Sequence, residues 1–330
     1  MVRSRRRRSD GFSLKKFLKD YPIVPIVAIV LGLGVLIGYG LGQKGFHWHY
    51  PTHRVLKPGT IHKTLVNTPI SMAAVPESII PNQIAEKLAE QERILPSEKE
   101  APFQLFGKKV QKPRIVFIID DVGYNKRYTE LLFSLDPHVT LAILPQLPYS
   151  KYFAEEAKKR GFPAILHLPL EPEDRDEDPG PGKITVDMGA NDVKAILEKD
   201  LASVPGVIGV NNHMGSRATR DRSLMYLILK ELKERHLLFL DSMTHPNSIG
   251  HRVAFALGMP MLKRDVFLDN KDDYDYVMNH INEACQVAKQ SGIAVVIGHY
   301  REKTLSAIKK ATPRLEAEGF ELATLTDVSK

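Results

Sequence analysis

Six short, mostly apolar runs between positions 115 and 299 constrain the fold of this chain more than any other feature. A strand that is buried on both faces has a continuous apolar run, whereas a strand with one solvated face alternates apolar and polar residues. The runs are therefore typical of a parallel sheet that is covered on both sides. They are IVFIID (115–120), VTLAIL (139–144), PAILHL (163–168), VIGV (207–210), LLFLD (237–241) and IAVVIGH (293–299).

Stretches with helical spacing separate these runs, and several of them end at or near a glycine, the residue that best adopts a left-handed helix C-cap. A last short strand is expected in ELATLTD (321–327), and the acidic, Pro- and Gly-rich segment 171–182 predicts a loop. Alternating strands and helices, with about seven strands, predict an α/β fold that is (β/α) barrel-like, seven-stranded and irregular. The expected helices span 151–160, 191–203, 223–235, 272–290 and 302–318.

The N-terminal region contains an uncharged apolar segment from Pro22 to Leu41. Its length is about that of a helix that crosses a membrane. The dense Lys and Arg residues before it place the N-terminus in the cytoplasm. A cleavable signal peptide is the alternative, although no clear Ala-x-Ala-like site follows the segment. We expect a single-pass signal-anchor helix over 22–42, with the remaining chain on the periplasmic or extracellular side.

Composition divides the 330-residue chain into a basic tail (1–21), the anchor (22–42), a linker or stalk (43–112) and an α/β domain (113–330). One helix is expected at 84–93 within the linker. Residues 1–20 carry eight basic and two acidic side chains, which supply +6 of the net charge of +7. The rest of the chain is nearly neutral, so we expect no nucleic-acid partner. Cys285 is the single cysteine and excludes an intrachain disulfide.

Polar side chains gather at the predicted strand ends, where parallel α/β domains place their active sites. Two imidazoles and a carboxylate commonly bind Zn²⁺ or another divalent ion, while a second carboxylate and a further histidine can act as base and acid. Metal-assisted hydrolysis of an acyl bond suits this set. Taken singly, some members also fit helix capping, core packing or turn closure. The residues are Asp120, Asp121, His167, Asn211, Asn212, His213, Asp241 and His299.

Three motifs carry a resemblance to the polysaccharide-deacetylase superfamily: IVFIIDDVGYN, NNHMGSR and VVIGHY. HLPLEP, GVNNHMGSRATRD and LLFLDSMT are similar to its divergent bacterial branch, and the resemblance spans about 113–328 of a deacetylase-like domain at 113–330. It implies Asp120 as general base, Asp121 and His213 as metal ligands, and His299 as general acid. It also implies a divalent metal, zinc being the first choice, and an acetylated polysaccharide or peptidoglycan-like substrate. Because that branch is bacterial, we expect the anchor at 22–42 to lie in a bacterial cytoplasmic (inner) membrane.

One position departs from the family pattern, because Arg217 stands where the second motif usually has a further metal-binding histidine. We expect His167 to supply the missing ligand, an inference from its place near a strand end. Ser216 and Arg217, together with Asn212, are predicted to contact substrate. Asp241 is predicted to orient a catalytic group or to join the metal shell.

The alternative function is a protein that binds carbohydrate or organises the envelope and has lost turnover. It rests on Arg217 and on the lack of a recognisable counterpart to the family's arginine-containing third motif. Hydrolysis of a phosphate ester at the same metal is a further option, disfavoured because no Gly-rich phosphate loop follows any strand.

Overall fold

The computed structural model describes residues 80–94, 112–260 and 262–329. The basic tail, the expected anchor at 22–42 and much of the expected linker lie outside these ranges. Within them, no helix has both the length and the apolar character needed to cross a bilayer.

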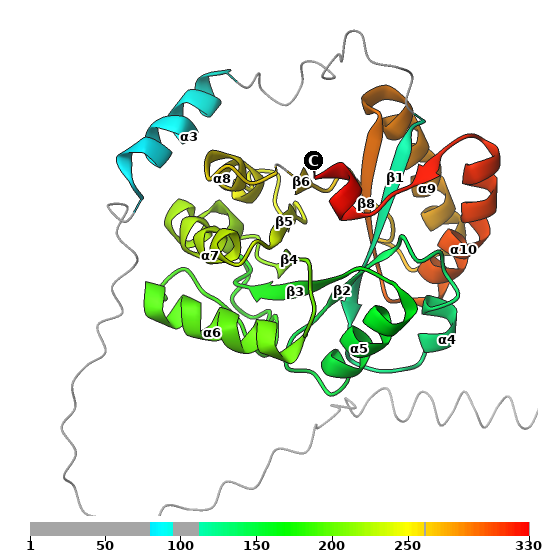
Figure 1. Cartoon of the computed structure of the whole chain (residues 1–330), viewed down its shortest axis with the longest axis horizontal. Coiled ribbons are helices and arrows are strands. Elements are labelled where there is room, and N and C mark those ends of the chain that lie inside the picture. The colour runs from blue at the N-terminus through cyan, green and yellow to red at the C-terminus, as the bar shows by residue number, and fades with distance from the viewer. Residues whose placement is uncertain (1–79, 95–111, 261, 330) are drawn as a thin grey trace, which may run out of the picture. The chain divides into compact units, whose positions relative to one another are not determined.

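One sheet of nine parallel strands organises the described residues, in the order β6-β5-β4-β3-β2-β1-β8-β7 with β9 beside β1 (Figure 1). The α/β, barrel-like prediction is confirmed, and all seven expected strands are present. The expected number was too low because β6 and β7 are only two residues long and leave no periodic signal. The strands are β1 (Arg114–Val122), β2 (Thr140–Ile143), β3 (Ala164–Leu170), β4 (Gly209–Met214), β5 (Leu238–Asp241), β6 (Leu262–Lys263), β7 (Val266–Phe267), β8 (Ile293–His299) and β9 (Glu321–Leu322).

The two end strands of this path, β6 and β7, are joined by only Arg264 and Asp265. The Arg264 N–H donates to the carbonyl of Asp241 on β5, and the Asp265 N–H donates to the carbonyl of Val295 on β8. Such a short connection requires the sheet to curl until its ends approach each other. No ladder pairs β6 with β7 within the described residues, so the sheet is an incompletely closed barrel.

The helices cover the outer side of this sheet, and Figure 1 shows α5, α6 and α7 beside the central strands. Their ends follow the expected local chemistry. Asp221 and Asp273 cap α7 and α9 by accepting backbone N–H groups, and Gly161 and Gly292 adopt the left-handed C-cap conformation. The helices are α3 (Asn82–Ile94), α4 (Thr129–Leu132), α5 (Ser150–Arg160), α6 (Ala190–Ser203), the 3₁₀ turn η2 (Ala218–Arg220), α7 (Arg222–Glu234), α8 (Gly250–Ala256), α9 (Tyr274–Ser291), α10 (Glu302–Ala317) and α11 (Leu325–Val328).

Alternation along the strands decides which side chains reach the barrel interior. Ile118 of β1 and Ile297 of β8 belong to a small apolar cluster that is separate from the larger core packed beneath the helices. Because strand side chains alternate with a period of two, Asp120 and His299 are the next residues on the same inner face. His167 follows an inner isoleucine of β3 in the same way. The buried strands thus direct these polar groups to one end of the barrel.

The loop between β3 and α6 packs closely on a buried carboxyl group of α6. Gly182 has a φ of +82°, and a Cβ at this position would overlap the carboxyl of Asp200. Gly206 has a nearly equal φ of +80° with nothing within 4 Å of its Cβ position. Gly182→Ala is therefore expected to lower the free energy of unfolding by about 2 kcal/mol more than Gly206→Ala. Urea unfolding of the two variants measures the difference, and equal losses would contradict the close contact.

Asp200 also predicts a dependence of stability on pH. Its side chain is fully buried, and burial raises its pKa to about 7 against a hydrogen bond from Gln146. Between about pH 4 and pH 7 the unfolded chain releases this proton while the folded chain keeps it, so stability falls as pH rises through this window. In the wild type, the free energy of unfolding should fall by roughly 1–3 kcal/mol across this window, and Asp200→Asn should remove this fall. Unfolding at pH 4.5, 6 and 7.5 tests this, with exposed Asp192→Asn of the same helix as control, and parallel curves for Asp200→Asn and the wild type would refute it.

Candidate active site at the barrel mouth

Three side chains from β1, β3 and β4 converge at the C-terminal end of the sheet. Asp121, His167 and His213 each present a nitrogen or oxygen atom, and the three atoms lie within 4.8 Å of one another. Asp121 Oδ1 is 3.4 Å from His167 Nε2 and 3.2 Å from His213 Nδ1. His213 Nδ1 is 3.1 Å from His167 Nε2. The structure therefore brings together the three residues that the sequence suggested as a ligand set.

A local irregularity in β1 allows both carboxylates of the acidic pair to face the site. Consecutive strand residues normally point to opposite faces. Here the register between β1 and β2 shifts between Ile119 and Val122, and Asp121 has a left-handed φ of 61°. A bulge of this kind redirects a side chain at the end of a strand. Asp120 consequently stays on the inner face while Asp121 also turns toward the histidines.

The donor atoms of this cluster fit a divalent cation. Asp121 Oδ1 is buried and has no hydrogen-bond partner among the described residues. Asn211 donates from Nδ2 to Asp120, which orients its Oδ1 to accept from His167 Nδ1 at 2.9 Å. Neutral His167 then has its proton on Nδ1 and a free lone pair on Nε2, the tautomer suited to metal binding. A cation would also relieve the close approach of two imidazole nitrogens.

Asp120 lies beside the cluster in a different environment. Its side chain is almost fully buried, Oδ1 accepts from Asn211 Nδ2 at 2.9 Å, and Oδ2 is 3.6 Å from His167 Nε2. Burial raises the pKa of Asp120, and the negative charge of Asp121 adds to this, although nearby histidines oppose it. For Asp121, burial acts in the same direction, but the adjacent imidazoles of His167 and His213 outweigh it and hold its pKa well below the usual range. Asp120 is thus the more basic carboxylate of the pair, and Asp121 is the less basic one.

His299 faces Asp121 from β8, with 3.8 Å between its Nε2 and Asp121 Oδ2. Its other nitrogen, Nδ1, lies 2.8 Å from Asp269 Oδ1, and Asp269 Oδ2 accepts from the His299 N–H and from the Thr304 hydroxyl. Burial opposes the charged form of His299, but the hydrogen bond to Asp269 and the nearby carboxylates raise its pKa. Asp269 thereby fixes the ring and favours its protonated state, as expected for a proton donor.

A half-buried cation lies near these groups. Arg264, in the connection that nearly closes the barrel, donates to the carbonyls of Ser242 and Met243 and lies over the ring of Phe267, 4.9 Å from its centroid. The rings of Phe267 and His299 pack edge to face, with 5.2 Å between their centroids. Burial lowers the pKa of Arg264, whereas the negative charge of Asp120 raises it. Arg264 therefore places a positive charge near the more basic carboxylate.

Comparison with known proteins decides the family. Residues 117–329 match the family model described as divergent polysaccharide deacetylase. The chain belongs to this family. The match covers the barrel from Phe117 onward and every strand-end residue discussed above, so the resemblance suggested by the motifs is confirmed.

The relatives of this chain include two curated bacterial proteins. An uncharacterised protein of Haemophilus influenzae is 33% identical over 198 residues, covering 59% of this chain and 70% of that protein. The uncharacterised protein YibQ of Escherichia coli K12 is 27% identical over 197 residues, covering 60% of this chain and 61% of that protein. The crystal structure of an uncharacterised protein from Agrobacterium tumefaciens C58 aligns with a TM-score of 0.64 at 21% identity, covering 67% of this chain and 91% of that one, and shows the same fold.

The structure does not bring every predicted site residue of the deacetylase domain into the cluster. Asp241 is fully buried on the helix-facing side of β5, where Oδ2 accepts from the Ser248 hydroxyl at 2.7 Å and contacts His251 Nδ1 at 2.9 Å. Asn212 donates to the Met214 carbonyl and accepts from the Ser242 N–H. These contacts connect the segments that follow β4 and β5. They engage the side chains of Asp241, predicted to take part in catalysis, and of Asn212, predicted to contact substrate.

The other two predicted substrate contacts lie on the loop after β4. Ser216 accepts from the Glu173 N–H at 2.8 Å, and Arg217 NH1 donates to Glu171 Oε1 at 2.9 Å. Arg217 also lines a cavity together with Glu171, Arg175 and Lys183. Of the substrate-binding predictions, Arg217 is the residue that the structure leaves facing an open pocket.

Two site residues of the deacetylase domain escaped the sequence reasoning. Asp269 follows the two-residue strand β7, which has no detectable pattern, so its strand-end position was invisible. Arg264 lies just before β7, and only the near closure of the barrel brings it close to Asp120. The tripeptide LDN at 268–270, an apolar residue followed by an acid, was the single usable signal in this stretch.

Proposed function

We propose that this protein is a metal-dependent hydrolase that removes acetyl groups from cell-envelope carbohydrate. The observation that carries the proposal is the meeting of Asp121, His167 and His213 with Asp120 on one side and the His299–Asp269 pair on the other. Three donor atoms, a basic carboxylate and an oriented imidazole are the groups that metal-assisted acyl hydrolysis requires. Membership of a deacetylase family supports acetyl groups on a polysaccharide or a peptidoglycan-like polymer as the substrate.

Asp121, His167 and His213 would hold the metal, with zinc as the first choice for a site of one carboxylate and two imidazoles. When bound, such an ion supplies Lewis acidity and makes water more acidic. Asn211 supports the site by fixing the tautomer of His167 through its side-chain oxygen. In this arrangement His167 supplies the third ligand in place of the family histidine whose position Arg217 occupies.

The remaining groups perform the proton transfers. The raised pKa of Asp120 suits it to accept a proton from the attacking water as the new C–O bond forms. His299, held protonated by Asp269, then donates from Nε2 to the nitrogen or oxygen that leaves the acetyl carbon. The products are acetate and a free amine or hydroxyl on the sugar, and the proton taken by Asp120 and the one given by His299 balance over the cycle.

We also propose that the chain is anchored by the uncharged segment at 22–42 in a bacterial cytoplasmic membrane, with the deacetylase domain outside the cytoplasm. The support is the length of the apolar segment and the basic residues that precede it. This location would place the barrel next to envelope polymers.

Acetate release tests the proposed activity. The purified chain is incubated with acetylated chitooligosaccharides and with peptidoglycan, with and without a chelator. Release that stops on chelation and returns with Zn²⁺ is the expected result. Binding of metal and glycan without any acetate would instead identify a protein that binds carbohydrate or organises the envelope and has lost turnover.

A further inference from the structure

An exposed aromatic side chain follows the acidic pair in the sequence and takes no part in the proposed reaction. Among the described residues, the large apolar side chains that face solvent are Tyr124, 51% exposed, and Phe255, 54% exposed. Phe255 belongs to α8, on the outer side of the sheet, whereas Tyr124 comes three residues after Asp121 in the turn that follows β1. Single exposed aromatic rings are common on protein surfaces, so the surroundings of Tyr124 decide its role.

The backbone that carries Tyr124 is held by hydrogen bonds from the segment after β2. The Leu144 N–H donates to the Val122 carbonyl at 2.9 Å, and the Tyr149 N–H donates to the Gly123 carbonyl at 3.2 Å. Gly123 has a φ of +132°, a conformation that glycine adopts readily and other residues rarely. Because the turn is already fixed, a ligand that covers the Tyr124 ring would order little additional backbone, and the ring is preorganised for binding.

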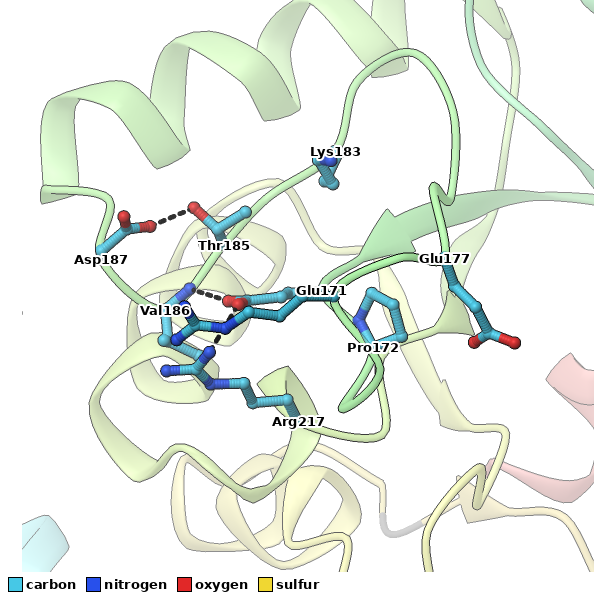
Figure 2. Close-up of a pocket in the computed structure, with 9 residues that line it drawn as sticks. Glu171, Pro172, Glu177, Lys183, Thr185, Val186, Asp187 and Arg217 are labelled. Carbon is cyan, nitrogen blue, oxygen red and sulfur yellow. Dashed lines mark hydrogen bonds and ion pairs between the residues drawn. The ribbon is translucent and has the colours of Figure 1, made fainter.

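The loop between β3 and α6 approaches the hydroxyl end of Tyr124. A Cβ built on Gly180 would lie 4.0 Å from the Tyr124 hydroxyl oxygen. This loop is held at its base, because Arg217 NH1 and the Val186 N–H donate to the two carboxylate oxygens of Glu171 at 2.9 and 2.8 Å (Figure 2). Tyr124 therefore has a fixed neighbour at its hydroxyl end, while about half of its surface stays open to solvent.

The proposed metal site is most open on the side of Asp121, the residue nearest to Tyr124 in the chain. The side chain of Asp121 is 29% exposed, against 13% for His213 and 2% for His167. A substrate carbonyl would therefore reach the three donor atoms past Asp121 and not past the buried His167. Burial raises the pKa of the Tyr124 hydroxyl, and the negative charge of Asp121 raises it further. The phenol thus stays neutral and lies close enough to Asp121 to interact with its charge.

The face of an aromatic ring suits one face of a sugar ring. The π system carries negative charge density above and below its plane. The C–H bonds on one face of a pyranose are apolar and weakly positive, so they pack favourably against this surface. A tyrosine ring also offers a large, rigid contact area at a small cost in side-chain entropy.

We infer that Tyr124 is a substrate-binding residue whose ring stacks against the pyranose that carries the acetyl group, when that group meets the metal ligands. The inference rests on the proposed function for the identity of this sugar. The contact needs the flat ring and not the hydroxyl, so phenylalanine should replace tyrosine without loss, whereas a side chain without a ring should not.

Calorimetric titration of the full chain with acetylated chitotriose, in chelator and without metal, tests this contact in the absence of turnover. Tyr124→Ala should weaken binding by about tenfold, because the stacked surface is lost. Tyr124→Phe keeps the ring and should bind within about twofold of the wild type. Phe255→Ala is the matched control, since it removes a similarly exposed ring from α8 and should leave the affinity unchanged. Circular dichroism checks that all the variants are folded.

Weaker binding in Tyr124→Ala, with near wild-type affinity in Tyr124→Phe and Phe255→Ala, supports the stacking contact. Wild-type affinity in Tyr124→Ala, an equal loss in Tyr124→Phe or in Phe255→Ala, or a wild type that does not bind the sugar overturns it. Acetate release by a wild type whose Tyr124→Ala variant binds normally would leave the proposed function intact. Binding that depends on the ring, without any acetate release, would remove only the enzyme proposal.

Discussion

Replacement of His167 by Ala is expected to weaken divalent metal binding by at least about 100-fold, because loss even of a group that only supports a ligand commonly costs 10- to 100-fold. The imidazole Nε2 lies 3.4 Å from Asp121 Oδ1 and 3.1 Å from His213 Nδ1, so its removal leaves two of the three donor atoms. Competition with a chromogenic chelator gives the affinity, and element analysis gives the stoichiometry.

His251→Ala is the matched control for this experiment. His251 is also a buried histidine whose Nδ1 contacts a buried carboxylate, Asp241, but it lies on α8 away from the cluster. Both variants lose a comparable buried contact, and only His167→Ala should lose the ion. Wild-type metal affinity and stoichiometry in folded His167→Ala would rule out His167 as a ligand. Arg217 would then mark a true loss of the third protein ligand.

Replacement of Asp120 by Asn is expected to reduce the rate of acetate release by roughly 100-fold or more while leaving metal content unchanged. The amide keeps the size of the side chain but cannot accept the proton of the attacking water. Release of acetate from acetylated chitooligosaccharides measures the rate, and element analysis of the same sample measures the ion.

Asp200→Asn is the control for the loss of a buried carboxyl, because Asp200 is equally buried and lies on α6 outside the site. It should retain the wild-type rate. An Asp120→Asn protein that releases acetate as fast as the wild type would remove Asp120 from the reaction. A simultaneous loss of metal would show instead that Asp120 supports the ligands, and the two readouts separate these roles.

Much of the fold could be predicted from the sequence because continuous apolar runs and glycine C-caps report local structure directly. The seven expected strands and the long helices follow from these signals, and Gly161 and Gly292 end helices as expected. The closure of the sheet could not be predicted, since it depends on two strands of two residues each and on the Arg264–Asp265 connection. Such short strands are held by their neighbours and not by their own composition.

The site was predictable where a side chain continues the inner face of a long strand. Asp120, His167 and His299 belong to this group. Asp241 also lies at a strand end, but consecutive strand residues point to opposite faces. Its side chain therefore points away from the barrel interior, toward α8, and accepts a hydrogen bond from Ser248. Asp269 was missed because its position depends on the tertiary pairing of β7 with β8. Polar residues at strand ends thus identify the edge of the sheet that carries the site. The face on which each side chain lies can be assigned only when the strand register is known.

The metal content of the purified full chain tests the central claim most directly. The cluster of Asp121, His167 and His213 predicts about one tightly held divalent ion per chain, zinc first, after dialysis against metal-free buffer. Element analysis of the folded wild-type protein gives this number. A folded chain that retains no divalent ion, and takes up none from added Zn²⁺, would contradict the proposed metal centre and the reaction built on it.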